Sequence, residues 1–235
     1  MPEHAYAGVR VPSARAVPGR PSGPAGLRAP LAVAAACVVA LAAVWSVAEL
    51  VPAAHLKDAV TLYRFTTLSR PGLDSIGHFL LRLLEPGLFV LWSIAIVATA
   101  LARERPRLAL AAIAVLGLAP LTSELLKPLL AHRHDVVGHV QVNPASWPSG
   151  HSTAATALVL CAVLVAPARL RPVLAAVGAA FVAAVSVSLL VLAWHMPSDV
   201  LGGYLVAGLW TALAVTGVRV SERLRPSRRV APQAG

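Results

Sequence analysis

The segment from Trp147 to Ala168 reads WPSGHSTAATALVLCAVLVAPA. It opens with a short polar turn and continues as a mostly apolar stretch. A second turn of the same kind, HMPSD at His195–Asp199, stands between two further apolar stretches. Long apolar stretches joined by short polar turns are typical of helices that cross a membrane, because spanning the hydrocarbon core takes about 20 mostly apolar residues.

The composition favours a membrane protein throughout. Hydrophobic residues make up 57% of the 235 residues and charged residues only 13%, whereas a soluble domain carries about 25% charged residues. The sequence therefore predicts an all-α fold, a polytopic membrane helical bundle with six transmembrane helices. The candidate spans are Leu31–Val51, Pro86–Leu101, Leu108–Leu125, Thr153–Ala168, Val173–Trp194 and Val200–Val218.

These spans form one predicted membrane domain, residues 30–220. Residues 1–29 are rich in Pro, Gly, Ala and Arg, have no apolar period, and are expected to be a disordered tail. Residues 221–235 form a second, basic tail. The first apolar segment is predicted to be a retained helix rather than a cleaved signal peptide, because it is long and follows a long polar stretch.

The positive charge predicts an orientation. The net charge is +10, and if six helices alternate in direction, fourteen cationic residues fall on one side and six on the other. The first side holds Arg10, Arg15, Arg20, Arg28, Arg103, Arg105, Arg107, Arg169, Arg171, Arg219, Arg223, Arg225, Arg228 and Arg229. The other side holds Lys57, Arg64, Arg70, Arg82, Lys127 and Arg133. Cationic residues near helix ends stay in the cytoplasm, so both termini are predicted to be cytoplasmic in a plasma-membrane protein.

The same alternation places residues 52–85, residues 126–152 and the turn at His195–Asp199 on the extracytoplasmic side. No fold signature of a nucleic-acid module accompanies the arginines, so nucleic acid is not an expected partner. The segment 52–85 carries Leu73, Ile76 and Phe79, with Leu80 and Leu83, at helical spacing. We predict an amphipathic segment on the outer leaflet, either packed over the bundle or admitting a lipid tail from the side.

The turn Pro148-Ser149-Gly150-His151 precedes the fourth span. Ser149 is a good N-cap, and Gly150 allows close backbone approach. A helix N-terminus binds phosphate readily through its unpaired N–H groups, and His151 lies in the first helical turn. The alternative is an ordinary cap with an incidental histidine.

His195 and Asp199 are four residues apart between the last two spans. A carboxylate that accepts a hydrogen bond from one imidazole nitrogen leaves the other nitrogen free to attack. The alternative is an interfacial histidine with Asp199 as a helix cap.

Lys127 follows the third span, and Arg133 lies six residues later. They are either a phosphate clamp or, for Lys127, a snorkelling side chain paired with Glu124. His132, His134 and His139 with Asp135 match no common zinc spacing, so no metal site is predicted.

Together these residues resemble the type 2 phosphatidic-acid phosphatase superfamily of membrane lipid phosphatases. Its motifs read K-x6-R-P, P-S-G-H and S-R-x5-H-x3-D. The second motif is complete at Pro148–His151, the third is matched at Ser188, His195 and Asp199, and the first is matched at Lys127. The span layout and motif order extend the resemblance over most of the chain beyond residue 30.

The resemblance implies a two-step phosphatase without metal or other cofactor. His195 attacks phosphorus to form a phosphohistidine, Asp199 orients it, and His151 serves as acid and then base. The phosphoryl oxygens are held by Lys127, Arg133, Ser149, Gly150 and Ser188. The substrate is a lipid phosphate or pyrophosphate: polyprenyl pyrophosphate, phosphatidylglycerol phosphate or phosphatidic acid.

Three positions depart from the family pattern. The first motif has His134 and Asp135 where the family has Arg and Pro, with Arg133 one residue early, and Leu189 replaces the arginine of the third motif. Neither Leu nor His reproduces the bidentate grip of a guanidinium on phosphate. The alternative function is therefore a weakened or non-catalytic relative that binds or moves a lipid phosphate.

Overall fold

The computed structural model describes residues 25–131 and 140–224, and every extended regular element in these residues is a helix. The helices in this part of the chain are α1 (Ala25–Leu50), α2 (Pro52–Thr66), α3 (Pro71–Arg82), α4 (Pro86–Ala102), α5 (Pro106–Leu129), α6 (Gly150–Val165), α7 (Arg171–Val191) and α8 (Pro197–Leu224). Six of them, α1 and α4 to α8, cover the six predicted apolar segments, which confirms the all-α membrane bundle.

Fewer helices pass a length and composition test for a membrane span than the six that the sequence predicts. By length and apolar composition, α1, α5, α7 and α8 can each cross a membrane, and α3 with α4 meets the same test as a pair bent by 56°. Helix α6 is apolar but has only 16 residues. The described residues thus hold four candidate spans, or five if the bent pair is one span, and six spans stays a prediction.

The predicted domain boundaries lie a few residues inside the observed helices. Helix α1 already begins at Ala25 and α8 runs to Leu224, so both extend into segments that were assigned to the tails. The rest of each predicted tail lies outside the described residues.

Local signals explain where the helices begin and end. Five helices start at a proline: α2, α3, α4, α5 and α8. The fixed φ of proline suits the first helical position, and its lack of an N–H costs nothing there because an N–H at that position has no acceptor within the helix. Beyond the end of α7, Ala193 adopts a φ of 55°. Trp194 N donates to Leu189 O at 2.9 Å and Ala193 N to Leu190 O at 3.1 Å, a Schellman arrangement that stops the helix sharply before His195.

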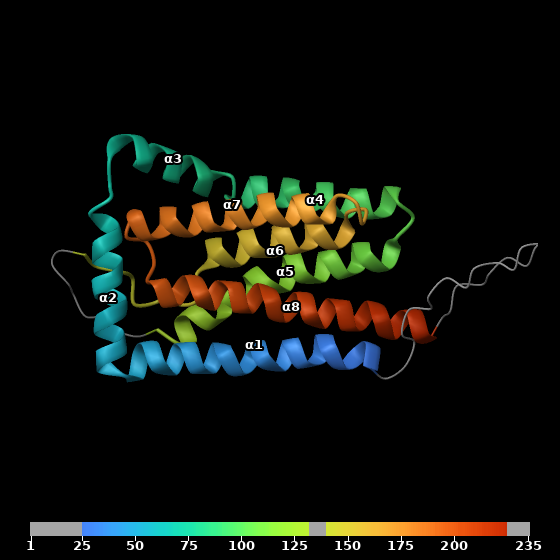
Figure 1. Ribbon diagram of the computed structural model, residues 1–235, viewed down its shortest axis with the longest axis horizontal. Coiled ribbons are helices and arrows are strands. Elements are labelled where there is room, and N and C mark those ends of the chain that lie inside the picture. Colours follow the sequence, from blue (N-terminus) through green and yellow to red (C-terminus); the bar gives the residue numbers. More distant parts are fainter. Residues whose placement is uncertain (1–24, 132–139, 225–235) are drawn as a thin grey trace, which may run out of the picture.

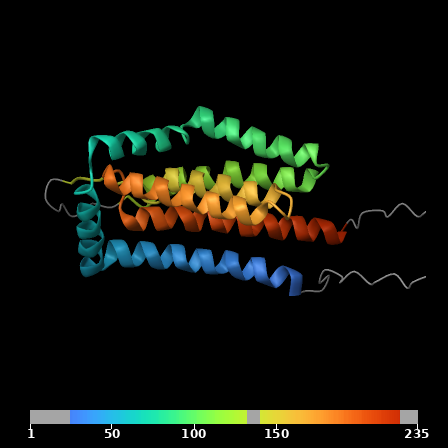
Figure 2. The same cartoon turned by 45° about the horizontal axis from the view of Figure 1, so that its top comes forward.

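The long helices alternate in direction, so chain segments far apart in sequence meet at one end of the bundle (Figure 1). We call this the α2 end, because α2 lies across it in both views (Figures 1 and 2). It carries the last turns of α1, α5 and α7 and the first turns of α6 and α8. The start of α1 and the end of α8 lie at the opposite end. Helix α8 is central and packs on α1, α5 and α6.

Helices α2 and α3 occupy the segment that was predicted to be amphipathic. Helix α3 packs on α7 through Gly77, whose missing side chain faces Ser188. Leu73, Ile76 and Phe79 are instead exposed. In a bilayer this apolar row is available to lipid.

Small residues let α8 approach α6 closely. A Cβ built on Gly203 would lie 2.7 Å from Ser149 O and 2.9 Å from Thr153 N, and one on Gly202 would lie 2.9 Å from the Trp147 ring. Such close backbone approach is typical of helix pairs in membranes. It presses the start of α8 against the turn that precedes α6.

Candidate functional site

Two hydrogen bonds, one between backbone groups and one from a side chain, tie the PSGH turn to its neighbours. Ser149 N donates to Asp199 O at 2.9 Å, and Ser123 Oγ on α5 donates to Pro148 O at 2.9 Å. Ser123, Ser149 and Asp199 are all fully buried. The second and third motifs, 50 residues apart in sequence, are therefore in direct contact at the α2 end.

Ser149 acts as the N-cap of α6. Its hydroxyl accepts a hydrogen bond from Ser152 N at 3.3 Å, while its carbonyl accepts one from Thr153 Oγ1 at 2.8 Å. The first N–H groups of a helix have no intrahelical acceptor and form its positive end. An anion at this point would therefore face the backbone N–H groups of Gly150 and His151. The turn can thus serve both as a helix cap and as an anion-binding site.

A buried carboxylate orients the His195 imidazole. His195 Nδ1 lies 3.2 Å from Asp199 Oδ2, and the same oxygen accepts a hydrogen bond from Met196 N at 2.9 Å. The second bond is the reciprocal half of a capping box at the start of α8. Asp199 thus serves the helix and the histidine together, and Nε2 of His195 is the nitrogen left for a reaction. Its catalytic role stays a prediction.

Lys127 lies in the last turn of α5 and forms an ion pair with Glu124, with 2.6 Å between Nζ and Oε1. The pair lies directly against Gly150: a Cβ built there would be 2.9 Å from Glu124 Oε1 and 3.4 Å from Lys127 Nζ. His195, Lys127 and Glu124 all lie within electrostatic range of the His151 imidazole. These four ionisable side chains therefore form one cluster around the start of α6.

Asp58 of α2 is a site residue that the sequence reasoning missed. Its carboxylate accepts hydrogen bonds from Ser198 N at 3.3 Å and Ser198 Oγ at 2.6 Å, within the His195–Asp199 turn. Burial raises the pKa of the Asp58 carboxyl, although the Ser198 hydrogen bonds act in the opposite direction. The available signal was Met196 at the N-cap position of α8, since a methionine cannot cap a helix and an external acceptor is needed.

Trp194 is a second residue that was missed. Its ring meets the His151 ring edge-on with centroids 5.7 Å apart, and the His78 ring of α3 with centroids 6.0 Å apart. Trp194 therefore forms a wall of the cluster and joins it to α3. A tryptophan just beyond the end of an apolar helix is typical of the membrane–water interface.

The structure places Ser188 and Leu189 in the helical packing of α7. Ser188 Oγ donates to Ala184 O at 2.8 Å and lies beside Gly77 of α3. Leu189 is fully buried in the apolar core. An arginine in its place would bury a guanidinium among apolar side chains, which is strongly unfavourable. The role of Ser188 in phosphate binding stays a prediction.

The loop that holds Arg133, His134 and Asp135, with His132 and His139, lies outside the described residues. The predicted clamp by Arg133 is therefore untested. Within residues 25–131 and 140–224, no group of three or more His, Cys, Asp or Glu side chains is arranged to hold a metal ion.

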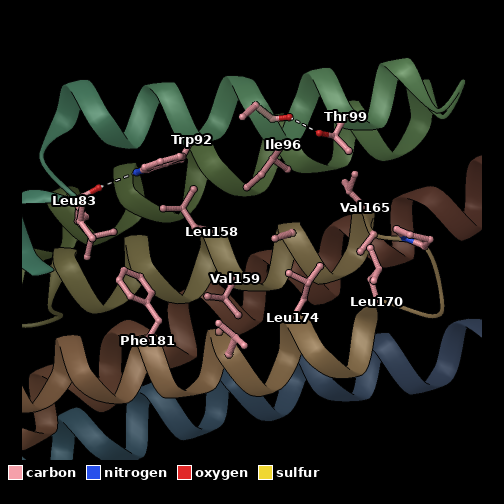
Figure 3. A pocket seen from close by; sticks show the side chains of 17 residues that line it. Leu83, Trp92, Ile96, Thr99, Leu158, Val159, Val165, Leu170, Leu174 and Phe181 are labelled. Atoms are coloured by element: carbon pink, nitrogen blue, oxygen red, sulfur yellow. Dashed lines mark hydrogen bonds between the residues drawn. The ribbon is translucent and has the colours of Figure 1, made fainter.

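An apolar groove of about 570 Å³ runs along α6, between α4 and α7 (Figure 3). Among its lining residues, Trp92 Nε1 donates a hydrogen bond to Leu83 O at 3.2 Å. The lining is almost entirely apolar and comprises Leu83, Leu84, Trp92, Ala95, Ile96, Thr99, Leu158, Val159, Ala162, Val165, Ala166, Pro167, Leu170, Leu174, Val177, Gly178 and Phe181. His151 and His195 do not line it, but α6 carries both the groove floor and, in its first turn, His151.

Comparisons with known proteins agree with this arrangement. A family model described as the PAP2 superfamily matches residues 87–223. A solved structure, the first transmembrane PAP2 type phosphatidylglycerolphosphate phosphatase from Bacillus subtilis, has a TM-score of 0.65 to this chain. That match covers 85% of this chain and 98% of the other at 22% sequence identity, and it shows a shared fold. No curated protein matches the sequence.

Proposed function

The chain belongs to the PAP2 superfamily, and from that premise we propose that it is an integral-membrane lipid phosphatase. The observation that carries the proposal is the contact between the two motifs. A buried Asp199 holds Nδ1 of His195, and its backbone carbonyl binds Ser149, the cap of the helix that carries His151. This arrangement supplies an oriented nucleophile, a second histidine and a helix N-terminus in one place.

The proposed reaction has two steps. Nε2 of His195 bonds to phosphorus while the bond from phosphorus to the lipid oxygen breaks, and His151 donates a proton to that oxygen. Water then attacks the phosphohistidine, His151 takes its proton, and the phosphorus–nitrogen bond breaks to release phosphate. Lys127, the first-turn backbone at Gly150 and Arg133 of the loop hold the phosphoryl oxygens as negative charge develops. No metal takes part.

The apolar groove supports a lipid as the substrate. It offers a chain-shaped apolar surface along α6, and a phosphoryl group at the start of the same helix would leave the lipid chain free to extend toward it. Candidate substrates are phosphatidylglycerol phosphate, phosphatidic acid and polyprenyl pyrophosphate. The structural neighbour named above acts on the first of these.

We propose that the α2 end faces the extracytoplasmic side of the plasma membrane. The arginine-rich turn at 103–107 and the turn at 169–171 lie at the opposite end, together with the described chain termini. Cationic residues at helix ends are retained in the cytoplasm. This orientation places both termini inside the cell and the histidines outside.

The second candidate is a relative that binds or moves a lipid phosphate without hydrolysing it. The observation that favours it is Leu189, which stands where the family has a phosphate-binding arginine and is fully buried in the core. The intact His151, His195 and Asp199 favour the enzyme instead.

The test is phosphate release from a panel of lipid phosphates by the purified protein in EDTA. We expect wild type to be active, His195→Ala to be inactive, and His78→Phe to remain active as a matched change of another histidine at the α2 end. An acid-labile phosphoprotein should form with wild type and not with His195→Ala. Normal hydrolysis by His195→Ala would rule out the mechanism. Binding without hydrolysis by wild type would establish the second candidate.

A further inference from the structure

Glu124 is a carboxylate within the cluster that the proposed reaction does not use. It lies on α5 one turn before Lys127, and its Oε1 is 2.6 Å from Lys127 Nζ. Its side chain is 60% exposed while that of Lys127 is 23% exposed. The carboxylate is therefore free to leave the pair, whereas the ammonium is held near the bundle.

The position of the carboxylate is as informative as its partner. Glu124 Oε1 would lie 2.9 Å from a Cβ on Gly150, so it stands against the first residue of α6. It thus meets an ammonium group and a positive helix end at the same point. A phosphoryl group binds to these same two features, because a phosphoryl oxygen and a carboxylate oxygen both accept charge-assisted hydrogen bonds.

We propose that the Glu124 carboxylate is a built-in occupant of the phosphoryl site, which an incoming phosphate must displace from Lys127. The inference rests on the proposed function, because it takes Lys127 and Gly150 to be that site. Glu124 is then a residue that sets how tightly any anion is held, rather than a catalytic one.

Displacement has a quantitative signature. When only a fraction of the protein is competent to bind, the apparent dissociation constant of every ligand rises by the reciprocal of that fraction. A largely exposed ion pair shifts such an equilibrium by about two- to fivefold. The factor does not depend on the charge of the ligand. The binding of product phosphate and of the phosphodiester headgroups of bulk lipid is therefore weakened by the same factor as the binding of substrate. This keeps product and bulk lipid from saturating the site.

The test compares wild type, Glu124→Gln and a control, Glu85→Gln. Glu85 is an exposed carboxylate at the start of α4 that is not part of the cluster. Dissociation constants for inorganic phosphate and for dibutyl phosphate, a phosphodiester monoanion, are measured by phosphorus NMR titration in detergent. Both constants should fall by the same two- to fivefold factor in Glu124→Gln and stay at wild-type values in Glu85→Gln. The difference should shrink in high salt, which screens the pair.

Three results would overturn the inference. Unchanged or weaker anion binding in Glu124→Gln shows that the carboxylate does not occupy the site. A larger improvement for inorganic phosphate than for the monoanion shows that Glu124 repels a bound ligand instead of standing in its place. If neither protein binds an anion, the inference falls, and the proposed function is judged separately by lipid hydrolysis in the same preparations.

Discussion

Removing the Asp58 carboxylate should loosen the turn that carries His195. Asp58 accepts hydrogen bonds from the backbone and the hydroxyl of Ser198, three residues after His195. Met196, at the N-cap position of α8, has no side-chain group that could replace it. Asp58→Ala therefore leaves an N–H at the start of α8 without its acceptor and frees the turn from α2.

The magnitude follows from these contacts. Loss of an N-capping acceptor costs about 0.5–2 kcal/mol. The carboxylate is itself penalised by burial, which raises the pKa of Asp58, so its removal recovers part of that loss. We expect a net destabilisation of about 0.5–1.5 kcal/mol, which lowers the Tm of a chain of this size by about 1–6 °C. Misplacement of His195 by about 1 Å would lower kcat by about 100-fold.

Asp58→Asn separates the hydrogen bond from the charge. The amide keeps one oxygen acceptor for Ser198 and has no charge to bury. Because the pKa of Asp58 is raised in the folded protein, its protonated form favours folding below the unfolded-state pKa, and this contribution is lost as the pH rises through the folded-state pKa. Asp58→Asn should therefore gain stability relative to wild type at neutral pH and lose that advantage in acid. His55 and Asp199 are the charged groups that also act on Asp58.

The assay measures Tm in detergent and kcat and KM for lipid phosphate hydrolysis. Asp74→Ala is the matched control, since Asp74 also is partly buried and accepts a hydrogen bond from a serine, Ser69, at 2.7 Å, but belongs to the first turn of α3. Asp58→Ala should lower kcat far more than it changes KM, and Asp74→Ala should leave kcat unchanged. A wild-type kcat and Tm in Asp58→Ala would refute the positioning role.

Three further outcomes are expected. Gly203→Ala should destabilise the protein by about 1–3 kcal/mol, because the added Cβ meets backbone atoms of the PSGH turn and of α6. Gly217→Ala on the same helix is the control, since a Cβ there has nothing within 4 Å, and equal Tm values for the two variants would contradict the packing argument. Ala193→Gly should stabilise the protein by about 1 kcal/mol, since Ala193 has a φ of 55°, and a lower Tm would show that this turn is held for another reason. A reporter fused after Gly235 should be active only in the cytoplasm, and activity only outside the cell would reverse the proposed orientation.

Much of the fold could be predicted from local patterns. The apolar runs located α1 and α4 to α8, because a helix is the structure that satisfies backbone hydrogen bonds in lipid. Proline at the first position and serine at the cap marked several helix starts within a few residues. The bend of 56° between α3 and α4 and the short α6 could not be read from composition, because both depend on how the neighbouring helices pack.

The candidate site was predictable in part for the same reason. His195 and Asp199 are one helical turn apart, so their pairing follows from local geometry. Lys127 and Glu124 are also neighbours on a helix, and the sequence suggested their pairing. That the pair stands against Gly150, and that Asp58 binds Ser198 from 140 residues away, depends on contacts between helices that no local pattern encodes.

The sequence by itself determined which residues lie in helices, which of them carry ionisable groups, and that the motif-bearing turns share one end of an alternating bundle. Helix formation and the retention of cationic loops in the cytoplasm depend on neighbouring residues and on the membrane, so the linear sequence is enough to predict both. Only the tertiary structure decided that Asp58 caps α8, that Trp194 covers His151, and that Glu124 stands at the start of α6. Those contacts exist because glycines let α6 and α8 approach closely and because α2 crosses the end of the bundle, and both are properties of the packed chain.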